Sequence, residues 1–394
     1  MQSDPIVIVG AARTPMAAFQ GDFATLAASD LGAAAIKAAV ERAGIAPDDV
    51  ERVIFGCVLP AGQGQAPARQ AALKAGLPVA AGCTTVNKMC GSAMEATMLA
   101  HDALVAGSCD IVVAGGMESM SQAPYLLPKA RTGYRMGHQQ VIDHMFLDGL
   151  EDAYDKGRLM GTFAEECADK YAFTREAQDA FAQASLARAL AAGNDGTFAW
   201  EIAPVTVTGR KGDVIVDRDE QPAKATPAKI PTLKPAFRKD GTVTAANSSS
   251  ISDGAAALVL MRRSTAEARG LKPLAVIVAH ATHAQKPGEF TTAPVGAIAK
   301  LYAKTGWRTA DVDLFEINEA FAVVTMAAMR EHGIAHDKVN VHGGACALGH
   351  PIGASGARIV VTLLGALRKH GGRRGVAALC IGGGEATALA VEIV

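Results

Sequence analysis

The stretch Asn87-Lys88-Met89-Cys90-Gly91-Ser92-Ala93-Met94 stands between two different local patterns. Residues 83–86 before it are apolar and typical of a strand, and a helical spacing of apolar residues follows it. The apolar face of that predicted helix consists of Met94, Met98, Leu99 and Leu104. Cys90 is therefore predicted on a strand-to-helix turn, where backbone N–H groups and the helix dipole favour thiolate over thiol. The small residues that follow Cys90 would let an acyl group approach its sulfur. The alternative interpretation of Cys90 is a buried structural cysteine.

Composition limits the classes of protein that this chain can belong to. Its 394 residues are enough for two domains and a large core. Hydrophobic residues make up 49% and charged residues 20%, as in ordinary globular proteins. A net charge of −1 gives no reason to expect nucleic acid or an anionic membrane as a partner. No apolar run approaches the length of a membrane span.

The cysteine count and the first residues bear on the compartment. Seven cysteines, an odd number in a long chain, argue against a disulfide framework and for a reducing environment. The chain passes directly into a predicted strand at residues 6–9, without the basic and apolar regions of a signal peptide. We therefore expect a cytoplasmic protein.

Strand and helix patterns alternate along the first 120 residues. Strands are predicted at residues 6–9, 53–55, 83–86 and 110–116, and helices at 26–43, 66–76 and directly after Cys90. This alternation predicts an α/β fold with a mostly parallel sheet covered on both faces. Residues 121–247 depart from it, but large apolar residues recur there and indicate an inserted domain rather than a linker. A second alternating series begins with a strand at 253–261.

The two series resemble copies of one another. Gly44, Asp49 and Val50 recur 262 residues later as Gly306, Asp311 and Val312. The segment 114–118 similarly matches 381–385, with its first glycine displaced by 267 residues. Two matches in one order and at near-constant offset predict a duplication. Two such halves would form a cleft where their strand ends meet.

Three segments of the second half carry unusual residues. Asn318 directly follows a predicted strand at 314–317. A purely structural role for Asn318 would be to cap the N-terminus of the next helix. Segment 343–356 contains five glycines together with Cys346 and His350, so its backbone is predicted to bend. Cys380 ends a strand, and three glycines after it leave backbone N–H groups exposed.

These residues raise the question of which chemistry they serve. His342, Cys346 and His350 are spaced for a metal site only on a helix, which the surrounding glycines oppose, and the chain has no CxxC or HExxH. Segment 353–356 does not fit the G-x-S-x-G of a serine hydrolase. The remaining interpretation is nucleophilic catalysis by a cysteine. A histidine would accept the proton of the cysteine, and glycine N–H groups would bind an oxyanion. Two cysteines suit a reaction with one acylated nucleophile and one separate base.

These motifs, in this order, resemble those of the thiolase family, and more closely its acetyl-CoA acetyltransferases. The matching segments are 87–94, 249–256, 318–322, 343–356 and 380–384. The resemblance implies the thiolase fold, in which two duplicated βαβαβαββ halves form a five-layered α-β-α-β-α core with an inserted loop domain. Residues 1–120 and 248–272 would form the N-terminal half, 121–247 the loop domain covering coenzyme A, and 273–394 the C-terminal half.

The resemblance also assigns roles at matching positions. Cys90 would be the acylated nucleophile and His350 the base that activates it. Cys380 would be the acid/base that removes an α-proton from the second acetyl-CoA. Asn318 would hold a water that, with His350, stabilises the enolate oxygen. Backbone N–H groups of Cys90 and Gly382 would bind the acyl-enzyme carbonyl.

Coenzyme A is the only ligand that the resemblance implies, without a metal ion or redox cofactor. Ser249 matches the serine that contacts pantetheine. The residues that match the lining of the pantetheine tunnel are Leu150, Met160, Phe237, Ala245 and Phe321. Lysines at 224, 229 and 234 either meet phosphates or form a solvated basic edge. The family's assembly implies a homotetramer, built as a dimer of dimers.

The activity implied is a reversible Claisen condensation of two acetyl-CoA to acetoacetyl-CoA and CoA through an acyl-cysteine. A degradative 3-ketoacyl-CoA thiolase of broader chain length is the alternative within the class. A coenzyme A-binding protein without turnover would lack one cysteine or the histidine, whereas Cys90, Cys380 and His350 are all present. A redox sensor that uses both cysteines is a further alternative, and it does not exclude the enzyme.

Overall fold

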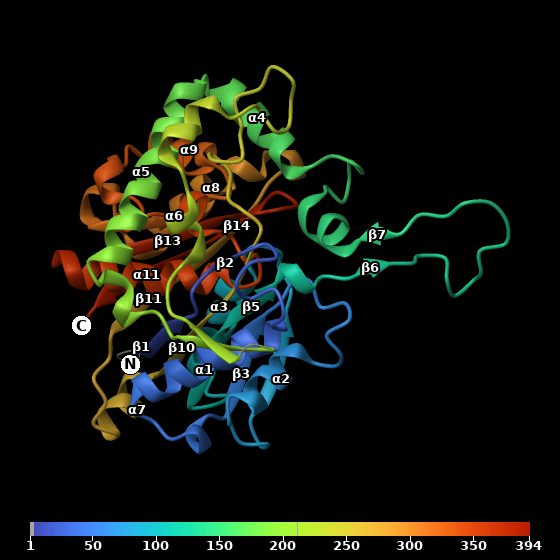
Figure 1. Cartoon of the computed structure of the whole chain (residues 1–394). Helices are drawn as coiled ribbons and strands as arrows, with labels where there is room; N and C mark the ends of the chain where they lie inside the picture. The colour runs from blue at the N-terminus through green and yellow to red at the C-terminus, as the bar shows by residue number, and fades with distance from the viewer. Residues whose placement is uncertain (1–3, 211) are drawn as a thin grey trace.

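The computed structural model describes residues 4–210 and 212–394 (Figure 1). Ten strands of these residues form one sheet, ordered β12-β13-β14-β11-β1-β10-β5-β3-β4, with β2 paired to β10. The strands are β1 (Ile6–Arg13), β2 (Ala17–Ala18), β3 (Arg52–Gly56), β4 (Gly82–Val86), β5 (Ile111–Ser119), β10 (Ser252–Arg262), β11 (Ala275–Ala284), β12 (Leu314–Ile317), β13 (Arg374–Ile381) and β14 (Glu385–Ile393). Only two residue pairs join β1 to β11, so the sheet consists of two halves connected by a short seam.

Helices cover the sheet in three layers. The helices of this core are α1 (Ala28–Ala43), α2 (Pro67–Lys74), α3 (Ser92–Val105), α7 (Arg263–Ala268), α8 (Ala293–Thr305), α9 (Ala322–His332), α10 (Ala345–Leu348) and α11 (Ser355–His370). One apolar cluster joins α1 and α2 to the first half of the sheet, and another joins α8 to the second half. The cluster between them contains α3, α11 and strands of both halves. The predicted five-layered α/β core is confirmed.

Both halves follow the order βαβαβαββ. The first half is β1-α1-β3-α2-β4-α3-β5-β10, and the second is β11-α8-β12-α9, a single parallel bridge at Val339, then α11-β13-β14. Gly44 and Gly306 end α1 and α8 in the left-handed conformation, with φ of 71° and 72°. Asp49 and Asp311 each accept the backbone N–H three residues earlier, at 3.0 and 2.8 Å. This repeat in the sequence is therefore also a repeat in structure.

Two expectations about the sheet are wrong. Among the named strands of the described sheet, parallel pairing is confined to β3–β4, β3–β5 and β12–β13, and the other neighbours are antiparallel. The alternation of strands and helices does not reveal that each half closes with two successive strands. The match of 114–118 to 381–385 also fails, because Gly115 and Gly116 lie inside β5 whereas Gly382–Gly384 follow β13.

The chain between β5 and β10 is an insertion with elements of its own. They are β6 (Tyr125–Leu126), β7 (Ile142–Asp143), α4 (Met160–Tyr171), α5 (Arg175–Asn194), β8 (Val205–Gly209), β9 (Gly212–Val216) and α6 (Glu220–Lys224). Figure 1 shows α4 and α5 lying along the core, while the segment between β6 and β7 projects from it. The exact limits of 121–247 stay a prediction. Within the described residues, no helix combines the length and apolarity needed to cross a bilayer.

A buried charge cluster fixes part of this insertion to the core. The Arg13 guanidinium on β1 donates to Glu201 at 2.6 Å and to Asp219 at 2.7 Å. All three side chains are almost completely buried. Removing one partner of such a cluster leaves an uncompensated charge, which is strongly destabilising. The cluster therefore holds the chain at Glu201 and at Asp219 against β1.

The central helices α3 and α11 cross at a glycine. A Cβ added at Gly356 would lie 2.4 Å from the backbone nitrogen of Met94 and 2.9 Å from its Cβ. Any larger residue would push the two helices apart.

We therefore expect Gly356→Ala to lower the free energy of unfolding by about 1–3 kcal/mol through overpacking. Equilibrium urea denaturation measures this change. Gly193→Ala, near the end of α5, is the matched control, because nothing lies within 4 Å of its added Cβ. The control should be neutral or slightly stabilising, and equal losses in both variants would contradict the close helix crossing.

Candidate active site

Cys90 lies on the predicted strand-to-helix turn. Strand β4 ends at Val86 and α3 begins at Ser92. Met89 adopts a left-handed φ of 47°, a strained conformation for a residue with a side chain. Ser92 Oγ stabilises the turn by donating to the Met89 carbonyl at 2.6 Å and accepting the Lys88 N–H at 2.9 Å. The predicted apolar face of α3 is wrong at one position, since Leu99 is 41% exposed.

His350 lies in the glycine-rich segment before α11 and is held by Ser355. Its Nδ1 is 2.6 Å from Ser355 Oγ, which lies 2.9 Å from the Pro351 carbonyl. When the hydroxyl donates to that carbonyl, Nδ1 of His350 is the donor and Nε2 is free to accept a proton. When the hydroxyl turns to His350, Nε2 carries the proton instead. In the sequence, Ser355 stands out only as a possible hydrolase nucleophile; its position five residues after His350 is the signal that points to this contact.

Asn318 lies beside His350 and does not cap a helix. Its Nδ2 is 3.5 Å from His350 Nε2, and its Oδ1 has no hydrogen-bond partner among the described residues. Helix α9 begins at Ala322 with Phe321 at its N-cap, so the capping interpretation is wrong. A buried amide with an unpaired oxygen is costly and typical of functional sites.

Cys380 lies at the end of β13, next to the Cys90 turn. Its side chain is buried, and Gly382 begins the turn to β14. A Cβ at Gly91 would lie 2.3 Å from Ile381 Cδ1, so the glycine allows this close approach. The backbone N–H of Gly382 donates toward the Cys90 sulfur. Strand ends from the two halves therefore meet, as the duplication predicted.

One cavity of about 370 Å³ collects ten of the eleven predicted site residues. They are Cys90, His350, Cys380, Gly382, Ser249, Leu150, Met160, Phe237, Ala245 and Phe321. The eleventh, Asn318, contacts His350 but is absent from the lining. A second cavity of about 360 Å³ shares Ala245 and is lined by Lys224 and Lys229, but not by Lys234.

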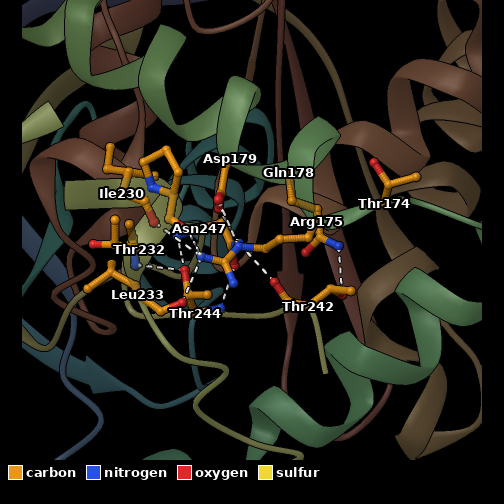
Figure 2. A network of polar contacts seen from close by, with 12 residues as sticks. Thr174, Arg175, Gln178, Asp179, Ile230, Thr232, Leu233, Thr242, Thr244 and Asn247 are labelled. Atoms are coloured by element: carbon orange, nitrogen blue, oxygen red, sulfur yellow. Dashed lines mark hydrogen bonds and ion pairs between the residues drawn. The ribbon is translucent and has the colours of Figure 1, made fainter. Parts of the chain in front are cut away.

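Figure 2 shows a polar network between α5 and the segment 230–247. Arg175 on α5 donates to the carbonyls of residues 230 and 233 at 3.1 and 2.8 Å. It also pairs with Asp179 at 2.7 Å, and Asp179 accepts the Asn247 amide at 3.0 Å. Helix α5 thereby holds the segment 230–247, which carries Phe237 and Ala245.

Burial determines the resting charge of the site. It raises the pKa of Cys90 to about 11; the N–H groups of Gly382 and of Cys90 itself oppose this, and the Glu118 carboxylate adds to it. Burial, with a smaller effect of Arg358, lowers the pKa of His350 to about 3. Burial also raises the pKa of Cys380 well above its ordinary value. The expectation of a resting Cys90 thiolate is therefore wrong, because loss of solvation outweighs the backbone N–H groups.

Glu118 is a residue near the site that the sequence analysis missed. From the end of β5 it accepts the backbone N–H groups of Val58 at 2.9 Å, Leu59 at 3.1 Å and Gly353 at 2.9 Å. Burial raises its pKa to about 7, against the effect of these hydrogen bonds. Glu118 thus joins the first half to the segment that carries His350. A lone carboxylate inside a buried apolar strand was the available signal.

The metal site considered for His342, Cys346 and His350 does not form. His342 Nε2 faces His370 Nε2 at 3.2 Å, and the Cys346 N–H donates to Glu319 at 3.0 Å. Because His350 faces Ser355, the three side chains have separate partners.

Comparison with known proteins identifies the family. Residues 6–264 match the model of the thiolase N-terminal domain, and residues 271–393 match the thiolase C-terminal domain. The chain belongs to the thiolase family. It is 53% identical to "Acetyl-CoA acetyltransferase 2" of Arabidopsis thaliana, over 98% of this chain and 97% of that protein. It is 51% identical to "Acetyl-CoA acetyltransferase" of Thiocystis violacea, over 99% of both chains.

A solved structure extends this thiolase comparison to three dimensions. The Acat5 thiolase from Ascaris suum, crystallised in complex with coenzyme A, superposes with a TM-score of 0.94 at 42% identity. The match covers 99% of this chain and 100% of that one. The predicted thiolase fold is confirmed.

The pKa of Cys90 predicts how its alkylation depends on pH. Because the folded pKa of about 11 lies above the ordinary value of 9.0, thiol is the main form at neutral pH. The rate of iodoacetamide labelling at Cys90 should rise about tenfold per pH unit from pH 7 to pH 10. Mass spectrometry of the Cys90 peptide measures this rate, with Cys90→Ser as the blank. A plateau below pH 8 would contradict the neutral resting site.

Proposed function

We propose that this thiolase is an acetyl-CoA C-acetyltransferase that condenses two acetyl-CoA to acetoacetyl-CoA and CoA, reversibly, through an acyl-Cys90 intermediate. The observation that carries the proposal is the meeting of Cys90, His350, Cys380 and the Gly382 N–H in one cavity. The names of the relatives at about half identity support the same activity. They give no support to the degradative alternative of broader chain length.

In the first half-reaction, Cys90 is acetylated. His350 Nε2 takes the proton of the Cys90 thiol, and the sulfur attacks the thioester carbonyl carbon of acetyl-CoA. The N–H groups of Cys90 and Gly382 stabilise the oxyanion that forms. The bond to the CoA sulfur then breaks, and the departing CoA thiolate takes a proton from the Cys380 thiol. His350 keeps the Cys90 proton as an imidazolium, which balances the charge of the Cys380 thiolate.

In the second half-reaction, Cys380 removes a proton from the methyl group of the second acetyl-CoA. Since Cys380 is buried and its thiolate is disfavoured, it must lose its own proton to departing CoA before acting as base. The enolate oxygen receives hydrogen bonds from the His350 Nε2–H and from a water held by Asn318. The enolate carbon attacks the acetyl carbonyl, the bond to the Cys90 sulfur breaks as acetoacetyl-CoA forms, and His350 returns its proton to the Cys90 thiolate.

The lining of the cavity indicates how the coenzyme is held. We assign the pantetheine arm to the apolar tunnel of Leu150, Met160, Phe237, Ala245 and Phe321, with Ser249 as a polar contact. The Ser249 hydroxyl already lies 3.0 Å from the Ala320 carbonyl, which fixes its orientation. No other cofactor is proposed for the reaction.

We further propose a cytoplasmic homotetramer, a dimer of dimers. The seven cysteines are free, which suits a reducing compartment. Strand β4 lies at the edge of the sheet, where its outer side has no partner strand in the described chain. Such an edge favours pairing with a second copy.

The proposed activity is tested by CoA-dependent cleavage of acetoacetyl-CoA beside a longer 3-ketoacyl-CoA. We expect efficient cleavage of the short substrate and at least about tenfold slower cleavage of the longer one, in line with the names of the relatives at about half identity. Comparable rates would favour the degradative thiolase. A folded, reduced protein that cleaves neither substrate would indicate a binding protein instead.

Two cysteine variants separate the half-reactions. Cys90→Ser should form no acetyl-enzyme by mass spectrometry. Cys380→Ser should still be acetylated by acetyl-CoA but lose condensation by at least about a hundredfold, because the α-proton has no base. Cys109→Ser, outside the cavity, is the matched control and should keep the full rate. Normal condensation by Cys380→Ser would overturn the assignment of the base.

A further inference from the structure

A cluster of three side chains lies away from the reaction cavity. His101 and Asp102 come from the second half of α3, and His280 comes from β11. Asp102 Oδ1 lies 3.0 Å from His101 Nδ1 and 2.9 Å from His280 Nε2. All three ligand atoms lie within 4.8 Å of one another, and none of these residues lines the cavity that contains Cys90.

We propose that His101, Asp102 and His280 form a binding site for a divalent metal ion, with Zn²⁺ as the best match. Two imidazole nitrogens and one carboxylate oxygen are a set of ligands that Zn²⁺ accepts, with water completing a tetrahedral shell. Bonds of about 2.0–2.1 Å to a tetrahedral ion place neighbouring ligand atoms about 3.3 Å apart. The two measured separations from Asp102 Oδ1 are therefore within a small side-chain adjustment of that geometry.

The surroundings keep the ligands in a suitable state. The His101 and His280 side chains are only 18% and 16% exposed, whereas Asp102 is 60% exposed and gives access from solvent. The Asp102 carboxylate compensates part of the ion's charge. The Lys304 ammonium is bound to the His280 carbonyl at 2.8 Å and is the nearby cation that opposes binding.

The site would connect the two halves of the fold. Helix α3 belongs to the first half and starts two residues after Cys90, whereas β11 begins the second half. These halves share only two residue pairs along β1 and β11. A bound ion would thus be a structural clamp across the seam, separate from the proposed acyl transfer, which uses no metal.

Calorimetric titration of the full-length enzyme with ZnCl₂ tests the site. The enzyme is first treated with EDTA, and Cys90 is blocked with iodoacetamide so that its thiolate cannot bind zinc. We expect one equivalent to bind with micromolar affinity and to raise the midpoint of thermal unfolding by several degrees. The cobalt(II) complex should show ligand-field bands without the charge-transfer band of a thiolate ligand.

Three variants identify the ligands. His280→Ala and Asp102→Asn should each weaken zinc binding at least about tenfold and abolish the thermal shift. Asp102→Asn keeps an oxygen that can accept a hydrogen bond, so it guards against loss of the fold. His138→Ala, on an exposed segment, is the matched control and should bind as the parent does. The proposal would be overturned if the parent showed no saturable zinc binding. It would also be overturned if the His280 and Asp102 variants bound zinc as tightly as the parent does.

Discussion

The close crossing of α3 and α11 is the contact on which the rest of the site depends. The crossing is possible because Gly356 has no side chain where its backbone contacts Met94. Both helices lie between the two halves of the sheet and share their apolar cluster. Cys90 lies two residues before the start of α3. Ser355 is the first residue of α11, and His350 lies five residues before it. The separation of the nucleophile from its base is therefore set by the packing of two buried helices, which tolerate little displacement.

Removal of water gives this site its chemical character. The same burial that raises the pKa of Cys90 lowers that of His350, so the resting pair holds a thiol and a neutral imidazole. Negative charge then develops mainly during the reaction. The N–H of Gly382 already points toward the Cys90 sulfur, beside which this charge develops. Fixed donors of this kind need no reorganisation when an oxyanion forms. The Ser355 hydroxyl adds adaptability, because rotation of a single proton supports either tautomer of His350.

Local sequence patterns predicted those features that depend on residues adjacent in the chain. The Cys90 turn, the helix ending at Gly44 and the glycine-rich turn after Cys380 were all visible in short windows, and the family resemblance placed the cavity lining. Strand direction was not visible, since it is decided by pairing between distant segments such as β5 and β10. Glu118 was missed for a related reason: it acts on Gly353, 235 residues away. The Cys90 thiolate was wrongly expected because a turn in isolation does not reveal how much solvation the sulfur loses when the rest of the fold packs around it.

The equivalent places of α3 and α11 in the two halves have an evolutionary consequence. A symmetric pair of identical halves would bring two copies of the same group to the centre, either two nucleophiles or two bases. Fusion into one chain freed each copy to change alone, so that one central helix now follows Cys90 and the other follows His350. Divergence after duplication thus converted a structural symmetry into a division of chemical labour.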